Sequence, residues 1–163
     1  MTVTLITDVA AINVVFRASF ADPSIDVSTD LANPKCVALD HDYGLIVYKP
    51  LRFAGQYHAW TAIKSNWTTQ ADVISIFDEC HDWAFRNSDA VLIEGDIPSS
   101  DTGLIAAVEK TQWTKITYRV ETVHAYAPIG QWAKAKGFQA AVDLLNANGW
   151  TQKAQKLRTA AGL

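Results

Sequence analysis

Two carboxylates, Glu94 and Asp96, are the first candidates for acid–base chemistry in this sequence. They follow the apolar run Ala90 to Ile93, which is typical of a buried strand. Side chains two residues apart on a strand lie on the same face, so both carboxylates face the same way. A carboxylate whose pKa is raised by burial can act as general base toward an amine. The alternative is a carboxylate pair at the solvated end of a strand, before the turn at Pro98.

The other reactive side chains form no constellation typical of a known chemistry. The cysteines and histidines lack the close spacing of metal ligands, so the sequence predicts no metal site; these residues are Cys36, Cys80, His41, His58, His81 and His124. The two isolated cysteines favour a reduced, intracellular setting. Neither a serine nucleophile elbow, a Walker loop nor a dinucleotide fingerprint occurs in the sequence.

The hydrophobic pattern predicts a sheet with helices to position these side chains. Alternating or apolar runs predict strands over 2–6, 36–40, 43–50, 56–63, 115–118 and 120–125. Helical periodicity predicts a helix over 9–20, capped by Asp8, and a second over 69–86. A third helix follows Pro98, with Ser99 or Ser100 as its cap and Asp101 in its first turn.

The stretch from Asp89 to Trp113 reads as a strand, a proline turn, a capped helix and an aromatic residue that opens another strand. With the preceding element order, it resembles the GNAT N-acetyltransferase superfamily along roughly Thr2 to Tyr126. The family's Tyr-Glu-Lys-x-Gly-Phe segment reads here Val108-Glu109-Lys110-Thr111-Gln112-Trp113. A valine therefore replaces the tyrosine that protonates the leaving thiolate.

The resemblance implies an α/β (α+β) fold with a central twisted mixed sheet flanked by helices. The strands near 56–63 and 90–96 are expected to be adjacent and parallel and to diverge. His58, in the middle of the first of these strands, then lines the groove where a substrate lies. The alternative for His58 is a core or surface histidine whose hydrogen bonds are satisfied within the chain.

The resemblance also places a coenzyme A pyrophosphate between the strand over 56–63 and the next helix. Here that segment reads Lys64-Ser-Asn-Trp-Thr-Thr-Gln-Ala-Asp72, without the glycines that allow the backbone to approach phosphates. Lys64, Asn66 and Thr68 are the candidates for contacts with an acyl-CoA. The preferred interpretation is that Asn66 or Thr68 only caps the helix. We therefore expect no cofactor, with acetyl-CoA as the alternative.

The pattern changes after Pro128, so the sequence predicts a GNAT-like domain over 1–127 and a helical extension over 128–163. Short helices are expected over 131–136, 138–148 and 151–161. Trp132, Phe138 and Trp150 are candidate anchors for a protein partner. The extension is either a clasp on its own domain or a docking element, and we favour docking for at least part of it.

Composition limits the partners of this 163-residue chain. A net charge of −3 gives no footprint for nucleic acid, so no specific nucleic-acid binding is expected. No apolar run approaches the roughly 18 residues of a membrane span. The N-terminus lacks the basic segment of a signal peptide. We expect a protein of the cytoplasm or of a virion, neither secreted nor bound to membranes.

The sequence leaves two functions open. In the favoured hypothesis, the chain is a GNAT-fold protein that has lost acyl-CoA catalysis and acts as a binding or assembly component. General resemblance to small head-assembly and internal virion proteins of short-tailed phages suggests other virion components as its partners. In the alternative, it is a divergent acyl-CoA-dependent N-acetyltransferase that acts on an amine, since positioning and an oxyanion contact suffice for attack on a thioester.

Overall fold

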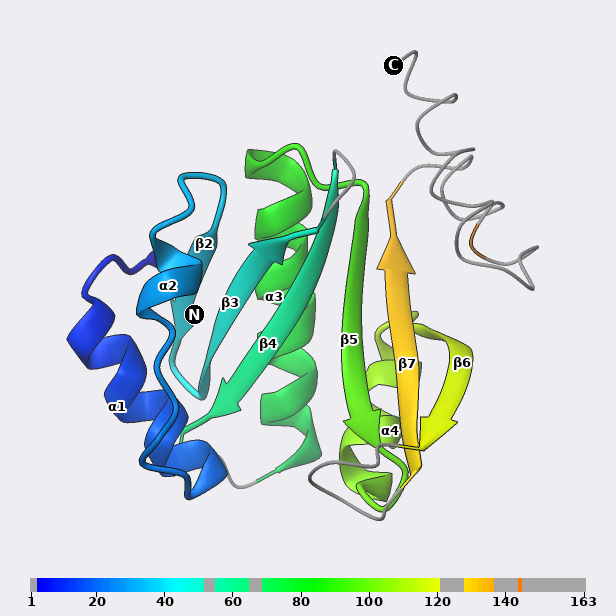
Figure 1. Cartoon of the computed structure of the whole chain (residues 1–163). Coiled ribbons are helices and arrows are strands. Elements are labelled where there is room, and N and C mark those ends of the chain that lie inside the picture. Colours follow the sequence, from blue (N-terminus) through cyan, green and yellow to red (C-terminus); the bar gives the residue numbers. More distant parts are fainter. Residues whose placement is uncertain (1–2, 52–54, 65–68, 121–127, 137–143, 145–163) are drawn as a thin grey trace.

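Seven strands form one mixed sheet in the computed structural model, which describes residues 3–51, 55–64, 69–120, 128–136 and 144 (Figure 1). The strand order is β1-β2-β3-β4-β5-β7-β6. The strands are β1 (Thr4–Leu5), β2 (Val37–His41), β3 (Gly44–Pro50), β4 (Gln56–Ile63), β5 (Leu92–Pro98), β6 (Thr114–Val120) and β7 (Pro128–Ala135). The predicted class, a mixed sheet flanked by helices, is confirmed.

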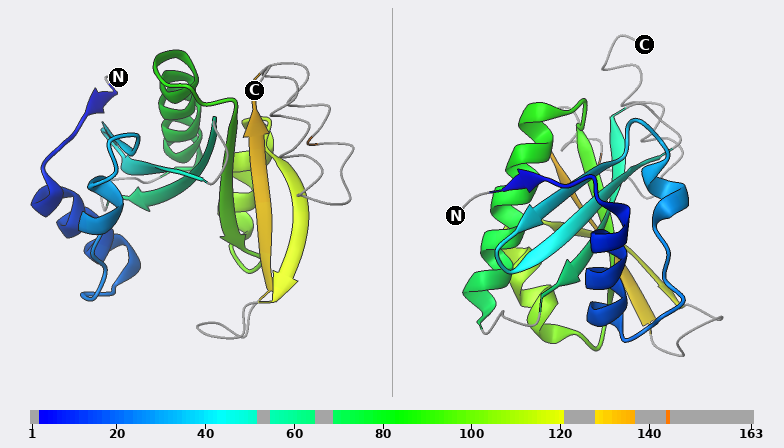
Figure 2. Two further views of the ribbon diagram at one scale, coloured as in Figure 1. Left: turned by 45° about the horizontal axis from the view of Figure 1, so that its top comes forward. Right: turned by 90° about the vertical axis from the view of Figure 1, so that its left-hand side faces the viewer.

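Helices cover both faces of this sheet. Helices α1 (Val9–Phe20) and α2 (Ser28–Leu31) lie on one face, over the strands at the N-terminal side (Figure 2). Helices α3 (Gln70–Asn87) and α4 (Thr102–Lys110) lie on the opposite face and contact each other. We call these the α1 face and the α3 face of the sheet. None of the described helices is long and apolar enough to cross a membrane.

Helix caps fix where three helices begin. Asp8 caps α1 as predicted, because its carboxylate accepts a hydrogen bond from Ala11 N at 3.1 Å. Thr69 caps α3, so the prediction of Asn66 or Thr68 as the cap is wrong. Asp101 caps α4, accepting from Leu104 N at 3.0 Å. The predicted cap Ser99 or Ser100 is therefore also wrong, since both serines lie in the turn that Asp101 N closes onto Pro98 O.

Strands β4 and β5 are adjacent and parallel, and they separate after three residue pairs. The pairs are Gln56 with Leu92, Tyr57 with Ile93 and His58 with Glu94. Beyond them β4 continues along β3 to Ile63, and β5 continues along β7 to Pro98. The expected diverging pair is confirmed, and α3 supplies the crossover between the two strands.

Strand β7 corrects the prediction for the C-terminal part of the chain. Residues 131–135 belong to a strand that pairs with β5 on one side and β6 on the other, so the helix predicted over 131–136 is wrong. Backbone hydrogen bonds to two neighbours outweigh the weak helical pattern of so short a segment. The extension predicted from residue 128 thus begins with a strand of the sheet. A chain cut before Gly130 loses most of that strand, so we expect it not to stay folded.

The structure describes one of the three candidate partner anchors, Trp132. Trp132 is 4% exposed and packs in the main core, which lies between the sheet and helices α3 and α4. Its burial within its own chain argues against the predicted role as an anchor for a partner. Alternation along β7 causes this, because Trp132 faces α3 while Ala133 faces the other side of the sheet. Phe138 and Trp150 lie outside the described residues. Leu144 packs on Leu92 and Ala133, so at this residue the C-terminal part contacts its own sheet.

His81 lies in the middle of the main core and is fully buried. Its Nδ1 lies 2.5 Å from Phe77 O and donates to it, and Nε2 is left as an acceptor with no hydrogen-bond partner among the described residues. Aromatic rings surround it, with Tyr48 and Trp113 both edge-on. Burial lowers the pKa of His81 from 6.5 to about 3, with the charge of Lys134 acting in the same direction and the hydrogen bond to Phe77 opposing it.

The buried His81 predicts that acid destabilises the protein. Between pH 6.5 and about 3 the unfolded chain binds a proton at His81 that the folded chain excludes. The free energy of unfolding therefore falls as the pH decreases, by roughly 1.4 kcal/mol per pH unit from this residue. His81→Leu should reduce that slope, as measured by urea unfolding from pH 7 to pH 4.5. An unchanged slope in the variant would contradict the assignment.

Candidate functional site

A cavity of about 410 Å³ lies where β4 and β5 separate. Its lining comes from both faces of the sheet, because the gap between the two strands is open through the sheet at this point. The α1-face lining includes Phe20, His58, Trp60 and Asp96, and the α3-face lining includes Phe77, Leu104, Val108 and Trp113. Two reactants can therefore approach the same gap from opposite faces.

The α3-face half of the cavity is apolar. Val108 stands where the family that the sequence resembles has a tyrosine. It is 1% exposed, and its side chain has no proton to donate. Trp113 packs its six-membered ring against Gly95, where a Cβ atom would lie 3.5 Å from the nearest ring carbon. Gly95 thus leaves the strand backbone open toward the cavity, with room for a methyl group but not for a large side chain.

Backbone groups of β4 face the gap. Gln56 O accepts from Leu51 N, and Lys64 N donates to Tyr43 O, so the even-numbered residues of β4 bond toward β3. The carbonyl group of Ala59 and both backbone groups of Thr61 therefore point toward β5, beyond the last β4–β5 pair. Among the described residues no strand lies opposite them there. A ligand with amide or carbonyl groups can take the place of the missing strand.

The α1-face half of the cavity carries the polar side chains. His58 and Glu94 lie side by side in register at the last pair of β4 and β5, and Asp96 lines the cavity on the β5 side. Glu94 and Asp96 project from the same face of β5, as their spacing predicts. Of the two candidate carboxylates, Asp96 lines the cavity and Glu94 does not. His58, which the sequence resemblance placed in the groove, also lines the cavity.

The start of α3 is satisfied by its own side chains. Thr69 Oγ1 accepts from Asp72 N at 3.3 Å, and Asp72 Oδ2 accepts from Thr69 N at 2.9 Å. This capping box uses two amides and adds a negative charge to a helix end that would otherwise attract an anion. The described part of this helix end therefore does not fit a diphosphate.

Of the three predicted coenzyme-binding residues, the structure describes Lys64, which does not line the cavity. Lys64 Nζ forms an ion pair with Asp40 at 2.7 Å and donates to His41 O at 2.7 Å, so its ammonium group is held at the end of β2. Asn66 and Thr68 lie outside the described residues. A second, apolar cavity of about 310 Å³ lies at the start of α3 and α4; Ile63, Gln70, Val73, Asp101, Gly103 and Leu104 line it.

Sequence reasoning missed part of the lining. Phe20, the last residue of α1, contributes to the cavity from about 40 residues before β4, and Asp101 contributes from the cap of α4. The unusual exposure of Phe20, 46%, is visible only in the folded chain. In the described part of the chain, no group of three or more potential ligands could hold a metal ion.

Comparisons with known proteins show the fold. No protein-family model matches the chain, and no curated protein matches it. Among solved structures, ribosomal-protein-alanine N-acetyltransferase from Brucella melitensis is similar with a TM-score of 0.66 at 11% identity, covering 83% of this chain and 100% of that one. Spermidine N-acetyltransferase from Vibrio cholerae in complex with CoA and spermine gives a TM-score of 0.66 at 9% identity, with coverage of 82% and 94%. The chain thus has the fold of GNAT acetyltransferases.

The capping box predicts how the start of α3 responds to an anionic ligand. Asp72→Asn removes the negative charge there, so CoA should bind the variant about two- to fivefold more tightly at low ionic strength, as expected from a charge at a helix terminus. Isothermal titration measures this change. Asp82→Asn, near the other end of α3, is the matched control with the same change in net charge. Equal effects of both substitutions would show that the helix terminus is not involved.

Proposed function

We propose that this protein transfers an acyl group from a thioester to an amine in the gap between β4 and β5. The observation that carries the proposal is the cavity through the sheet, which has strand-edge amides in the gap and a histidine and a carboxylate on one face. The similar acetyltransferase structures support it at the level of the fold. The thioester occupies the apolar α3-face half, and the amine enters from the α1 face.

The residues of the gap serve the transfer by positioning and polarisation. The amide N–H of Thr61 donates to the thioester carbonyl and stabilises the negative charge that develops on its oxygen. The amine nitrogen attacks the carbonyl carbon, the new C–N bond forms, and the C–S bond breaks. The sulfur leaves as a thiolate and takes up a proton from solvent, since Val108 cannot supply one.

The proton released by the amine needs an acceptor on the α1 face. His58 and Asp96 both line the cavity there, and we assign the proton to the imidazole of His58, because histidine is the commonest general base in enzymes. Glu94 is paired in register with His58 at the apex of the gap and does not line the cavity. His58 thus takes the role that the sequence pattern suggested for the two carboxylates.

The donor is held by its amide-bearing arm more than by its phosphates. A pantetheine arm carries amide groups that match the strand-edge peptides of Ala59 and Thr61, whereas the start of α3 is occupied by its own capping box. Acetyl-CoA fits this donor class, and a shorter acyl-pantetheine should bind with similar affinity.

A second candidate is a binding or assembly component without turnover. The observation that favours it is the negative charge of Asp72 at the start of α3, because it opposes a phosphate-bearing coenzyme. Under this proposal the protein partner is unidentified. The resemblance to virion proteins of short-tailed phages stays a prediction.

Blocking the gap tests the proposed transfer. Gly95→Leu extends a side chain toward Trp113 and into the cavity, so binding of acetyl-pantetheine should weaken by more than about tenfold, with acyl transfer lost. Gly95→Ala is the matched control, since its methyl group makes only ordinary contacts, the nearest at 3.5 Å. Calorimetry measures binding, and chromatography of acetylated amine measures transfer. If the unmodified protein binds neither acetyl-CoA nor acetyl-pantetheine, the proposal is refuted.

Replacing the base separates chemistry from binding. His58→Gln keeps a polar side chain of similar size but accepts no proton, so the transfer rate should fall by about 10²-fold or more while thioester affinity stays within about twofold. A pH–rate profile should lose the limb that reports the histidine. An unchanged profile in His58→Gln would assign the proton to another group.

A further inference from the structure

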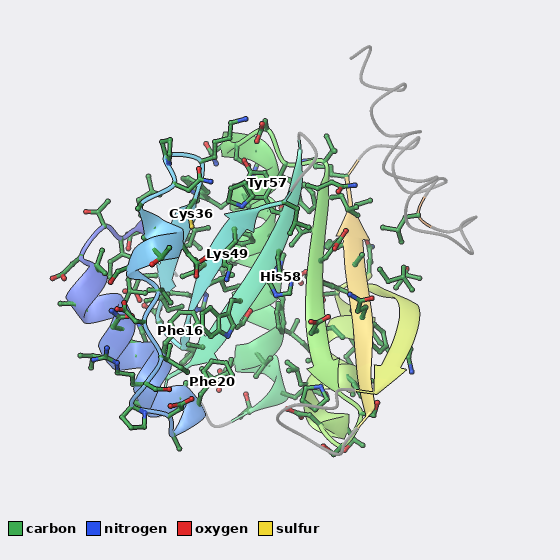
Figure 3. All side chains as sticks on the ribbon, in the orientation of Figure 1. Phe16, Phe20, Cys36, Lys49, Tyr57 and His58 are labelled. Atoms are coloured by element: carbon green, nitrogen blue, oxygen red, sulfur yellow. The ribbon has the colours of Figure 1, made fainter. Side chains whose placement is uncertain are left out.

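An aromatic wall forms one side of the cavity on the α1 face. Trp60 on β4 meets Phe16 edge-on, with ring centroids 4.7 Å apart, and Phe20 at 6.0 Å. Phe16 is fully buried and supports the wall from behind, whereas Phe20 is 46% exposed and lines the opening. Figure 3 shows both phenylalanines near the C-terminal end of β4, with His58 nearer to the start of the strand. A large exposed aromatic ring at a cavity mouth offers a contact surface for an apolar ligand.

The charges around this wall favour a cationic group close to Asp96 and disfavour one close to Lys49. Asp96 lines the cavity opposite the wall and provides a carboxylate on this face. Lys49 Nζ lies 5.1 Å from the Trp60 ring centroid and 3.0 Å from Asp30, so Asp30 is already paired. Asp101, the other carboxylate of the cavity lining, belongs to α4 on the α3 face and accepts a hydrogen bond from Leu104 N.

A long polycation fits this arrangement poorly. Its second ammonium group would extend along the wall toward Lys49, where like charges repel and the nearby carboxylate is paired. A single ammonium on a flat or branched apolar body instead meets Asp96 with its charge and the rings of Phe20 and Trp60 with its body. Ammonium groups are also attracted to the faces of aromatic rings.

We infer that the α1-face half of the cavity binds a monoamine whose amino group is carried on an aromatic or bulky apolar body. This inference deepens the proposed function, since the bound amine is the acceptor of the acyl group. It names the acceptor class by three observations together: the exposed ring of Phe20, the Phe16–Phe20–Trp60 wall and the carboxylate of Asp96, which lines the cavity on that face. The inferred acceptor class, a monoamine, differs from polyamines such as spermidine.

Binding of three probes without any thioester tests the inference. The probes are 2-phenylethylamine, its neutral analogue 2-phenylethanol and spermidine, titrated into the full-length protein and followed by tryptophan fluorescence and calorimetry. We expect 2-phenylethylamine to bind at least about fivefold more tightly than the other two, the size of a ring contact plus a charge contact. Weaker or equal binding of 2-phenylethylamine compared with spermidine overturns the inference, as does no binding of any probe.

Two substitutions locate the site. Phe20→Ala should weaken 2-phenylethylamine about fivefold, and Asp96→Asn should bring its affinity down to that of 2-phenylethanol. Val14→Ala is the matched control, because Val14 is also an exposed apolar residue of α1, at 65%, but does not line the cavity. Equal affinities in Phe20→Ala and Val14→Ala would place the amine elsewhere and overturn the inference.

The outcomes separate this inference from the proposed function. Tight binding of 2-phenylethylamine with no thioester binding would refute acyl transfer and leave an amine-binding site. Efficient acyl transfer to spermidine but not to 2-phenylethylamine would support acyl transfer and refute the acceptor class inferred here.

Discussion

The early end of the β4–β5 pairing is the constraint on which the rest of the site depends. Parallel strands in a sheet normally satisfy each other's backbone along their length, and unsatisfied peptide groups in an interior are costly. Here the two strands share three pairs and then follow different partners, β3 and β7. The strand edges beyond His58 and Glu94 face the cavity, so the same break that shortens the pairing creates the cavity.

Each neighbouring element responds to that break. Helix α3 crosses from β4 to β5 and, with α4, closes the α3 face with apolar side chains such as Phe77 and Val108. Helix α1 ends beside β4 and brings Phe20 to the other face. Strand β7 fills the far edge of β5 and buries Trp132 against the core. These contacts hold the two halves of the sheet together on either side of the gap, so the gap can stay open.

Electrostatics divides the site into parts with different preferences. The capping box at the start of α3 removes the attraction for phosphates that a free helix N-terminus would have. The polar groups that line the cavity lie on the α1 face, where His58 and Asp96 face a wall of aromatic rings. This distribution of charge is consistent with the proposed reactants. The acyl donor would be recognised by the amide groups of its pantetheine arm, and the acceptor by its ammonium group and its apolar body.

Elements with local sequence signals were predicted correctly before the fold was known. Alternation and capping gave β4 as Gln56–Ile63 and α1 as Val9–Phe20, because side-chain period and the Asp8 cap act within a few residues. The same local signals misassigned residues 131–136, whose conformation depends on pairing with β5 and β6. Only the tertiary structure decided that Phe20, His58, Asp96 and Trp113 share one cavity. Packing between distant elements brings them together, and no periodicity in the chain encodes that contact.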